Sequence, residues 1–492
     1  MAKIRYDKRI NDYEVRIDNP NEVPITLFAT KDVAIDNKSI EEIVKFASLA
    51  DTIKDLSKES FFSNDKASIK QIVLTPDFHR GAGIPIGTVL ETEGFILPKA
   101  VGNDIGCGVS SIITDISVEE FNSINQKELD NKLRYIFFEG GRNISLSAKQ
   151  REAFFRYGPL ALAGGETFNR LHLPISNMDY QLEVENLSNM HNTGYFYTNK
   201  DIFGVADFIK GSGNEYTYDD QIGSIGGGNH FVEIQAINKI IDAKTAWQWN
   251  IRKDMIHIMV HSGSVGIGHI VGTHFMDLAK KLYPSGLSNP ITKFYPLCSN
   301  SDAATQYIGA MNNANNFAKV NRLFLKLMTL KALSEILKRN VNHKLIWDAP
   351  HNLIWENFGI DTFLHRKGAC PAEEDSPVIV PGSMGDSSYI MKGKGNTTCL
   401  CSACHGAGRI TSRQSSRRTN VNELDTIRIV TKVDPQASAF QRRPDLLADY
   451  QSSMLEEAPS SYKPVLPVID TIVKAGIADS VVELKPLLTI KG

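Results

Sequence analysis

Five short segments of the 492-residue sequence combine glycines with histidine, cysteine or carboxylate side chains, the residue types that bind metals and activate nucleophiles. They are PDFHRGAG with Asp77 and His79, VGNDIGCGV with Asp104 and Cys107, GSIGGGNHFVE with His230, HSGSVGIGH with His261, and WDAPHNL with His351. A thiolate is a soft ligand and a carboxylate is a hard one, and together they suit zinc or manganese rather than magnesium. Each histidine alone is better explained as a structural residue, and Cys107 alone as a small buried residue in a tight turn. Together, Asp104, Cys107, His230, His261 and His351 predict a two-metal site, provided that the Cys107 thiolate bridges the ions.

Two glycine-rich segments have the composition of an anion-binding loop. The glycines at 223 and 226–228 are not followed by Gly-Lys-Ser/Thr, which excludes a Walker A motif, and they lack the βαβ context of a dinucleotide site. A glycine turn that leads into a strand is the alternative there. In VPGSMGDSSYIMKGKGN, Ser383, Ser387, Ser388, Lys392 and Lys394 lie among glycines, where hydroxyls and backbone N–H groups can bind anions.

The segment CLCSACHGAGRITSRQSSRR allows two interpretations. Cys399, Cys401, Cys404 and His405 form a C-x-C-x-x-C-H pattern, which is cramped for a tetrahedral zinc site. The alternative is that His405 is an exposed nucleophile in a glycine-flanked loop. Arg409, Arg413 and Arg417 follow at four-residue spacing and would form one basic stripe on a helix. Such a stripe is usually only a solvated face, but here it is a candidate for binding an RNA backbone.

The periodic segments must position these loops. Residues 39–57 have helical spacing, residues 68–116 contain short β-rich runs, and MIHIMVHSG at 255–263 predicts a buried strand in which His257 is a core residue. The strongest helix prediction covers 310–340, with Leu, Phe and Met on one face. Residues 176–220 are polar and aromatic and predict a surface excursion. No repeat or linker divides the chain, so we expect one large mixed α/β domain over 1–492.

Composition excludes several classes of protein. The chain is 42% hydrophobic and 22% charged, which argues against disorder, collagen and coiled coil. The net charge of −2 requires any polyanion to bind a local basic surface. The N-terminus lacks an apolar signal segment, and no uncharged apolar run reaches the length of a membrane span. Six scattered cysteines do not predict a disulfide framework, and we expect a cytoplasmic protein.

The same segments, taken in order, resemble the RtcB family of GTP-dependent RNA ligases. The resemblance rests on PDFHRGAGIPIG, VGNDIGCGV, GGGNHFVE, HSGSVGIGH, MNNANNFAKVNR, HN at 351–352, HRKGA, PGSMG, KGKGN, SACHGAGRITSR, APSSYK and the terminal KG. These motifs extend from about residue 70 to the last residue. The resemblance implies a single RtcB-like domain in which helices surround β-sheets and a central cleft holds metal and nucleotide.

The resemblance also implies roles for individual residues. Asp104, Cys107 and His230 would hold one Mn²⁺ ion, and Cys107, His261 and His351 a second. His405 would attack the α-phosphate of GTP and become a covalent guanylate. The guanylate-binding positions implied are Asn229, His230, Phe231, Val232, Glu233, His351, Asn352, Pro381, Gly382, Ser383, Met384, Ser388, His405, Gly406, Ala407, Gly408, Tyr462 and Lys491.

The implied reaction joins an RNA 3′-phosphate or 2′,3′-cyclic phosphate end to a 5′-hydroxyl end, in RNA repair or tRNA splicing. GMP would pass from GTP to His405, then to the RNA 3′-phosphate, and would leave when the 5′-hydroxyl attacks. The K-x-D-G motif of ATP-dependent ligases is absent, in agreement with a histidine nucleophile. RNA and, as for some relatives, an accessory activator protein are the partners implied.

Three departures from the family pattern suggest a divergent paralogue with a changed RNA substrate. Val265 replaces the arginine of HSGSRG, HRKGACPA loses an arginine at Pro371, and Asp386 and Ser387 stand where Ala and Arg are common. A metal-dependent phosphoesterase that opens cyclic phosphates without ligation is the main alternative, and it would not need His405. A non-catalytic RNA-binding relative is the third possibility, but all five expected metal ligands are present.

Overall fold

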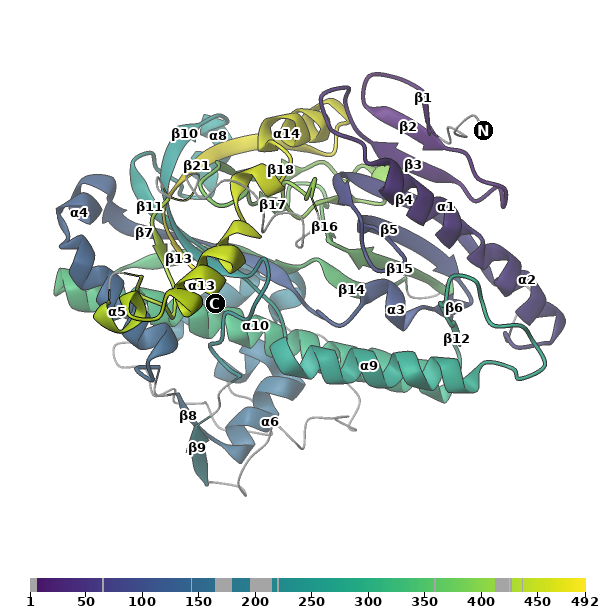
Figure 1. Ribbon diagram of the computed structural model, residues 1–492, viewed down its shortest axis with the longest axis horizontal. Helices are drawn as coiled ribbons and strands as arrows, with labels where there is room; N and C mark the ends of the chain where they lie inside the picture. Colours follow the sequence, from purple (N-terminus) through teal and green to yellow (C-terminus); the bar gives the residue numbers. More distant parts are fainter. Residues whose placement is uncertain are drawn as a thin grey trace.

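Two large sheets lie side by side and form the centre of the molecule (Figure 1). The computed structural model describes residues 7–63, 66–142, 144–163, 179–194, 215–218, 221–357, 360–411, 424, 427–435 and 437–492. Helices cover the outer faces of both sheets, so the expected mixed α/β class is confirmed. No helix among the described residues has the length and apolar composition needed to cross a membrane.

The first sheet contains seven strands in the order β1-β2-β3-β4-β5-β15-β14. Its strands are β1 (Asp7–Arg9), β2 (Glu14–Ile17), β3 (Ile25–Phe28), β4 (Ser68–His79), β5 (Ile86–Glu93), β15 (Thr362–Lys367) and β14 (Asn352–Asn357). The predicted helical segment 39–57 forms two helices, α1 (Asn37–Ala47) and α2 (Leu49–Lys58). The break lies at Ser48, whose hydroxyl donates to the Lys45 carbonyl at the end of α1. Apolar residues of both helices pack with this sheet in one core.

The second sheet has eight strands, seven of them in the order β13-β7-β11-β10-β21-β18-β17, while β20 pairs with β21. These strands are β13 (His343–Pro350), β7 (Gly108–Ser117), β11 (Met255–Ser262), β10 (Phe231–Ile240), β21 (Ala478–Ile490), β18 (Ser388–Gly393), β17 (Pro377–Val380) and β20 (Ile429–Val430). The strand predicted at 255–263 is confirmed as β11. His257 is fully buried in it and hydrogen-bonds Ser111 and Gln235, as expected for a core histidine.

Helix α10 (Asp302–Leu337) contains the segment predicted to be helical but differs from the prediction in its burial. It begins at Asp302, eight residues before the predicted start, and is capped by Ser301, whose hydroxyl accepts from the Ala304 N–H. The expected single apolar face is wrong, because the helix is buried on all sides from Asn313 to Leu330. Its polar residues, among them Lys319 and Arg322, are also buried. Burying a polar group is unfavourable unless it is hydrogen-bonded, and several of the hydrogen-bond partners of these residues belong to the site.

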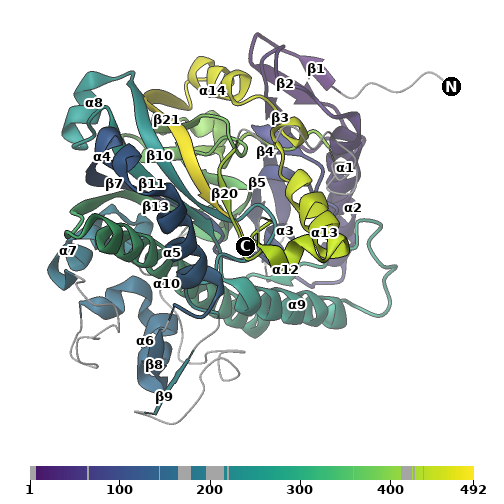
Figure 2. The ribbon, with the colours of Figure 1, turned by 60° about the vertical axis from the view of Figure 1, so that its left-hand side comes forward.

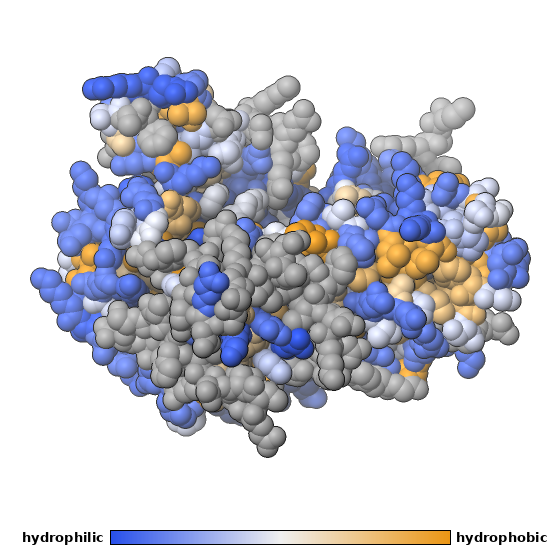
Figure 3. All heavy atoms as spheres, turned by 90° about the horizontal axis from the view of Figure 1, so that it is seen from below, coloured by the Kyte–Doolittle hydropathy of each residue, from blue (hydrophilic) through white to orange (hydrophobic). Residues whose placement is uncertain are grey.

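Helices α9 (Val265–Leu282), α5 (Gln126–Phe138) and α6 (Ala148–Tyr157) pack near α10 (Figure 2). The remaining elements are α3 (Pro98–Val101), α4 (Val118–Ser123), α7 (Tyr180–Glu185), α8 (Ala243–Gln248), α12 (Ser438–Gln441), α13 (Pro444–Leu455), α14 (Val465–Lys474), β6 (Phe95–Ile96), β8 (Ser145–Ser147), β9 (Tyr216–Tyr218), β12 (Leu297–Cys298), β16 (Ala369–Pro371) and β19 (Ser402–Cys404). Short 3-10 turns cover Gly158–Leu162, Asn186–Asn189, His191–Gly194, Thr397–Cys399 and Pro459–Ser461. Seen from below, the described surface is mainly hydrophilic, with hydrophobic residues gathered at one side (Figure 3).

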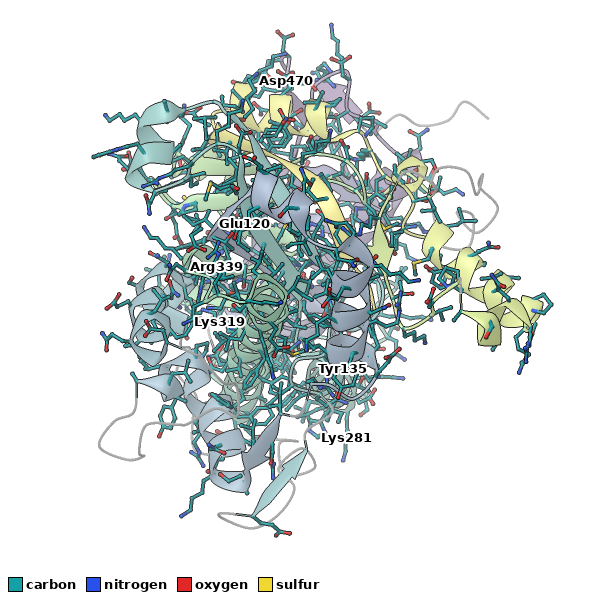
Figure 4. The ribbon with its side chains drawn as sticks, turned by 90° about the vertical axis from the view of Figure 1, so that its left-hand side faces the viewer. Glu120, Tyr135, Lys281, Lys319, Arg339 and Asp470 are labelled. Carbon is teal, nitrogen blue, oxygen red and sulfur yellow. The ribbon has the colours of Figure 1, made fainter. Side chains whose placement is uncertain are left out.

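The end of α10 is fixed to β7 and α4 by ion pairs. The Arg339 guanidinium donates to Glu120 at 2.7 Å and to Asp115 at 3.0 Å, and Figure 4 shows Arg339 and Glu120 facing each other. The two hydrogen-bonded carboxylates raise the pKa of Arg339 well above its usual value. This anchor keeps the buried helix in register with β7, the strand that follows Cys107.

The surface excursion predicted over 176–220 falls partly outside the described residues. Its described residues are 179–194 and 215–218, in which Asp179, Gln181 and Glu185 are exposed, whereas Asn186, Leu187 and Met190 are buried. Glu183 is also buried there, where it accepts hydrogen bonds from Lys326 of α10 and from His343 of β13. The polar composition that predicted exposure thus includes a buried, charge-paired carboxylate.

Candidate functional site

Four neighbouring strands of the second sheet bring the predicted metal ligands to one edge. Cys107 immediately precedes β7, His230 immediately precedes β10, His261 lies at the end of β11, and His351 immediately follows β13. Because these strands are antiparallel, the starts of β7 and β10 and the ends of β11 and β13 lie at the same edge. The register places Gly108 opposite both Ser262 and Pro350, and Phe231 opposite His261. Sheet pairing therefore gathers ligands that are far apart in the sequence.

The ligand atoms converge on the Cys107 sulfur. His230 Nε2 lies 3.2 Å and His261 Nε2 3.3 Å from Sγ, and His351 Nε2 lies 3.4 Å from His261 Nε2. Asp104 Oδ2 lies 3.1 Å from His230 Nε2. Two ligand triads result, Asp104–Cys107–His230 and Cys107–His261–His351, each with its donor atoms within 4.8 Å of one another. These are the two predicted sets, and they share the thiol.

The donor set, which combines a thiol, a carboxylate and three imidazoles, fits a pair of divalent transition-metal cations. One thiol proton cannot satisfy the imidazole nitrogens and the carboxylate that surround Sγ. Ligands about 2.0–2.3 Å from a tetrahedral ion lie roughly 3.3–3.8 Å from one another, which is close to the separations found here. Burial holds the pKa of His261 and of His351 well below the usual range, so both imidazoles are neutral, the form that binds metals. Burial and the nearby Asp104 raise the pKa of the Cys107 thiol, and a bound cation would favour its thiolate.

Helix α10 is hydrogen-bonded to the loops that carry the candidate metal ligands. Arg322 donates to the Gly106 carbonyl at 2.8 Å and the Ser262 carbonyl at 3.0 Å, and its remaining N–H groups form a double hydrogen bond with Asp348. Asn321 accepts from the backbone N–H groups of residues 223 and 224 and donates to the carbonyls of 224 and 263. These buried polar residues explain why α10 is not amphipathic, since the loops that carry the ligands are hydrogen-bonded to it.

His405 lies beside the second triad and is oriented by Asp77. The His405 ring centroid is 4.7 Å from that of His351, and its Nδ1 is 2.7 Å from Asp77 Oδ2. The Asp77 carboxylate also accepts from the Thr75 hydroxyl at 2.5 Å. Burial alone would raise the pKa of Asp77, but His405 and the hydrogen bond from Thr75 outweigh it and lower that pKa. An ionised Asp77 accepts Nδ1–H, so the Nε2 lone pair of His405 is available as a nucleophile.

The loop after His405 passes against β4 at a position that only glycine accommodates. Gly408 has a φ of +80°, and a Cβ there would lie 2.1 Å from the Asp77 carbonyl oxygen. The Lys463 N–H donates to the Gly408 carbonyl at 2.8 Å, and the Lys463 ammonium donates to the carbonyl of Phe78 at 2.7 Å. These contacts hold the glycine-flanked loop against the strand that carries Asp77.

A cavity of about 870 Å³ opens in front of His405 and His261. The predicted guanylate-binding residues that line it are Asn229, Phe231, Glu233, Pro381, Gly382, Ser383, Met384, His405, Gly406, Ala407, Gly408, Tyr462 and Lys491. Other predicted positions do not line it. Val232 is buried in the core, and the Ser388 hydroxyl accepts a hydrogen bond from the Gly382 N–H. His230 and His351 belong to the metal triads. The Asn352 amide donates to the Asp104 carbonyl and accepts from the Gly368 N–H, so it stabilises the site from outside the cavity.

The sequence interpretation left several lining residues without a role. Asp36, Lys38, His79, Arg80, Lys367, Glu457 and Thr489 all face the cavity. The cluster PDFHRGAG was recognised, but the pairing of Asp77 with His405 was not predicted because the two residues meet only in the folded chain. Glu457 directly precedes the APSSYK motif but lies outside it, so that motif did not identify the residue.

One end of the cavity carries a carboxylate and an ammonium group. Burial raises the pKa of Glu233 to about 7, although hydrogen bonds from Thr489 and Gln235 oppose that shift. Lys491 donates to the carbonyls of Gly228 and His230, the latter at 3.3 Å. Glu233 can therefore accept hydrogen bonds from a ligand when it is ionised, within a wall fixed by Lys491.

Of the three arginines of the predicted basic stripe, only Arg409 lies among the described residues. Arg409 lies in an isolated β-bridge with Tyr462 rather than in a helix. Its guanidinium donates to Tyr462 and Glu457 and to backbone carbonyls, so it is already held by protein acceptors. Arg413 and Arg417 lie outside the described residues. Arg409 therefore shapes the cavity wall through Tyr462 and Glu457.

The zinc interpretation of the cysteine cluster finds no support among the described residues, where only the two triads above qualify as metal-ligand groups. Cys399 and Cys401 hydrogen-bond nearby carbonyls, and His405 Nδ1 faces Asp77. Of the positions that depart from the family pattern, Val265 begins α9 with a φ of +49°, a strained conformation for a β-branched residue. Pro371 ends β16, which pairs with β19 just before His405.

Comparisons with known proteins agree with these motifs. A family model described as "tRNA-splicing ligase RtcB" matches residues 63–492. The chain is 31% identical over 450 residues to RNA-splicing ligase RtcB homolog 1 of Entamoeba dispar, covering 85% of this chain and 78% of that protein. It is 28% identical to the tRNA-splicing ligases RtcB of Archaeoglobus fulgidus and Thermococcus kodakarensis, covering 87% and 88% of those proteins and 85% and 86% of this chain.

Proposed function

Because this chain belongs to the RtcB family and is an RNA ligase, we propose that it joins RNA 3′-phosphate or 2′,3′-cyclic phosphate ends to 5′-hydroxyl ends, using GTP and manganese. The observation that carries the proposal is the position of His405. Its Nδ1 is hydrogen-bonded to Asp77, and its ring lies beside the Cys107–His261–His351 triad at the floor of the large cavity. A phosphoesterase without ligase activity would not need an oriented histidine there.

In the first step, His405 Nε2 attacks the α-phosphorus of GTP. A nitrogen–phosphorus bond forms, the bond to the pyrophosphate oxygen breaks, and pyrophosphate leaves. Asp77 keeps the proton on Nδ1 and stabilises the positive charge that the ring gains. When bound at the two triads, manganese ions would neutralise phosphate charge and align the attacking and leaving groups.

In the later steps, the guanylate moves from protein to RNA and is released. After water opens any cyclic phosphate, an oxygen of the RNA 3′-phosphate attacks the guanylate phosphorus and the bond to His405 breaks. The 5′-hydroxyl oxygen then attacks the terminal 3′-phosphorus, GMP leaves, and a phosphodiester bond remains. Glu233 and Lys491 would bind the guanine edge, and Ser383 with the backbone around Pro381 to Met384 would bind the sugar and phosphate.

Incubation with Mn²⁺ and GTP labelled at the α-phosphate tests the proposal directly. We expect label on the wild-type protein and none on His405→Ala, and we expect only the wild type to seal RNA. If His405→Ala seals RNA as well as the wild type, the guanylylated histidine is excluded. Cyclic phosphate opening by a wild-type protein that binds Mn²⁺ but takes no label would instead identify the phosphoesterase.

A further inference from the structure

A second cavity of about 560 Å³ lies beside the first and is lined largely by one face of α1. Lys38, Glu41, Glu42, Lys45 and Phe46 contribute to it, a spacing of three, four, seven and eight residues that places them on the same side of the helix. Lys38 and Arg80 line both cavities. The α1 groove, defined by these residues with Gly83 and Thr292, is therefore contiguous with the cavity that contains His405.

Helix α1 is fixed to the wall of the active-site cavity. The Glu42 carboxylate accepts from the backbone N–H groups of Gly81 and Gly83, each at 2.8 Å. These glycines follow His79 and Arg80 in the loop between β4 and β5, whose β4 end carries Asp77. Family resemblance does not assign this helix a role, because the match to the family model begins at residue 63.

The α1 groove carries three cationic side chains and two carboxylates, so its net charge is positive. Lys38, Lys45 and Arg80 are exposed, and no carboxylate of the described chain lies within 4 Å of their charged groups. Glu42 is engaged by two backbone N–H groups, which leaves Glu41 as the acidic side chain of the groove without such a partner. Lys38 and Lys45 are seven residues apart on α1, which corresponds to about 10 Å along the helix axis. The cations thus follow the groove away from His405.

We propose that the α1 groove binds the sugar-phosphate backbone of one of the two RNA strands that the enzyme joins. The inference rests on the proposed RNA ligase function and adds to it a contact beyond the reacting end. Lys38 and Arg80 face the phosphates closest to the end, and Lys45 faces a phosphate farther along the strand. Such contacts raise affinity without reading sequence, because the backbone is the same in every RNA. They also supply positive charge to a chain whose family-pattern arginines are missing at Val265 and Pro371.

Binding of a fluorescent single-stranded RNA with a 3′-phosphate, and of one with a 5′-hydroxyl, tests the groove without requiring ligation. Lys45→Ala is the informative variant, since Lys45 lines the groove but not the main cavity. Binding weakens as salt rises, and loss of one single-strand phosphate contact makes the negative slope of log K against log salt shallower by about 0.7. In 0.1 M salt this corresponds to roughly 5-fold weaker binding than that of the wild type. We expect this change for one of the two RNAs. The matched control Lys54→Ala removes an exposed lysine of α2 outside both cavities and should bind like the wild type.

Strand length provides the second measurement. A strand too short to reach Lys45 should bind the wild type and Lys45→Ala equally, whereas a longer strand should distinguish them. The proposal is overturned if both variants show the same affinities and salt slopes for both RNAs at both lengths, with unfolding curves like that of the wild type. Failure of the ligase function itself is separate, because it would appear as the absence of labelling and sealing in the wild type.

Discussion

The imidazole Nδ1 of His405 lies 2.7 Å from the carboxylate Oδ2 of Asp77, a residue 328 positions earlier in the chain. Asp77 is fully buried near the end of β4, and His405 follows β19, which packs on β4. An ionised carboxylate at this distance selects the tautomer that carries its proton on Nδ1. Asp77 therefore determines which His405 nitrogen can attack phosphorus.

Asp77→Asn should leave the fold intact and slow the guanylylation of His405 by roughly 10²- to 10⁴-fold, the range for losing the group that orients a catalytic histidine. The amide cannot stabilise the charged ring and can favour the wrong tautomer. The rate of label transfer from GTP to the protein measures the effect. Asp277→Asn, which changes an exposed carboxylate of α9 outside the cavity, is the control. A near-normal labelling rate in Asp77→Asn would show that the hydrogen bond has no part in activation.

The local signals of the sequence were sufficient for the ligands and for several elements. Cys107, His230, His261 and His351 each flank a strand that residue pattern or glycine turns could locate. What the sequence pattern could not supply is the strand order β13-β7-β11-β10, since that order depends on pairing between distant segments. Residue types and glycine turns suggested one two-metal site, and family resemblance divided its ligands into two triads before the pairing was known.

Burial of polar residues is the other feature that local patterns did not predict. The sequence predicted a helix with one apolar face, yet the polar residues Lys319, Asn321 and Arg322 are all buried in α10. Their partners are loop carbonyls and Asp348, which come from other parts of the chain. The same applies to Arg409, whose acceptors Glu457 and Tyr462 come from a segment about 50 residues farther along the chain.

Removing the shared sulfur should affect both metal ions, whereas removing an unshared ligand should affect chiefly one. We expect Cys107→Ala to lose most of both Mn²⁺ ions, and His230→Ala or His351→Ala to retain about one. Metal content after gel filtration, together with Mn²⁺ titration by electron paramagnetic resonance, measures this difference. Cys370→Ala changes a buried cysteine outside both triads and should retain both ions. Equal losses in Cys107→Ala and His351→Ala would argue against a bridging thiolate.

GTP binding should weaken as the pH falls below about 7. The pKa of Glu233 is raised to about 7 by burial, so the carboxylate becomes neutral below that value and can no longer accept two guanine N–H groups. The affinity for GTP should then fall by up to about tenfold for each pH unit. The decrease ends when the affinity reaches that of the protein with a protonated Glu233. Isothermal titration with GTP in the absence of RNA measures this dependence. Glu233→Gln should bind GTP weakly and without this transition, and a transition that persists in Glu233→Gln must come from another group.

The buried charge network on α10 should contribute to stability in a pH-dependent way. Burial alone would raise the pKa of Glu183, but Lys326 and the hydrogen bond from His343 outweigh it and lower the pKa to about 2. Because the pKa is lower in the folded than in the unfolded chain, this stability is present above pH 4.5 and is lost as the pH falls towards 2. Lys326→Met should lower the unfolding free energy at pH 7 by roughly 3–5 kcal/mol, since it leaves Glu183 buried beside His343 alone.

The double variant Lys326→Met/Glu183→Gln separates this effect from lost packing. It removes both charges, so its loss of unfolding free energy should be smaller than the sum of the two single losses, and urea denaturation at pH 7 measures all three. The difference between wild type and Glu183→Gln should also shrink as the pH approaches 2. Additive losses with no pH dependence would mean that Lys326 stabilises α10 through its aliphatic chain, and that the carboxylate packed against it carries no charge in the folded protein.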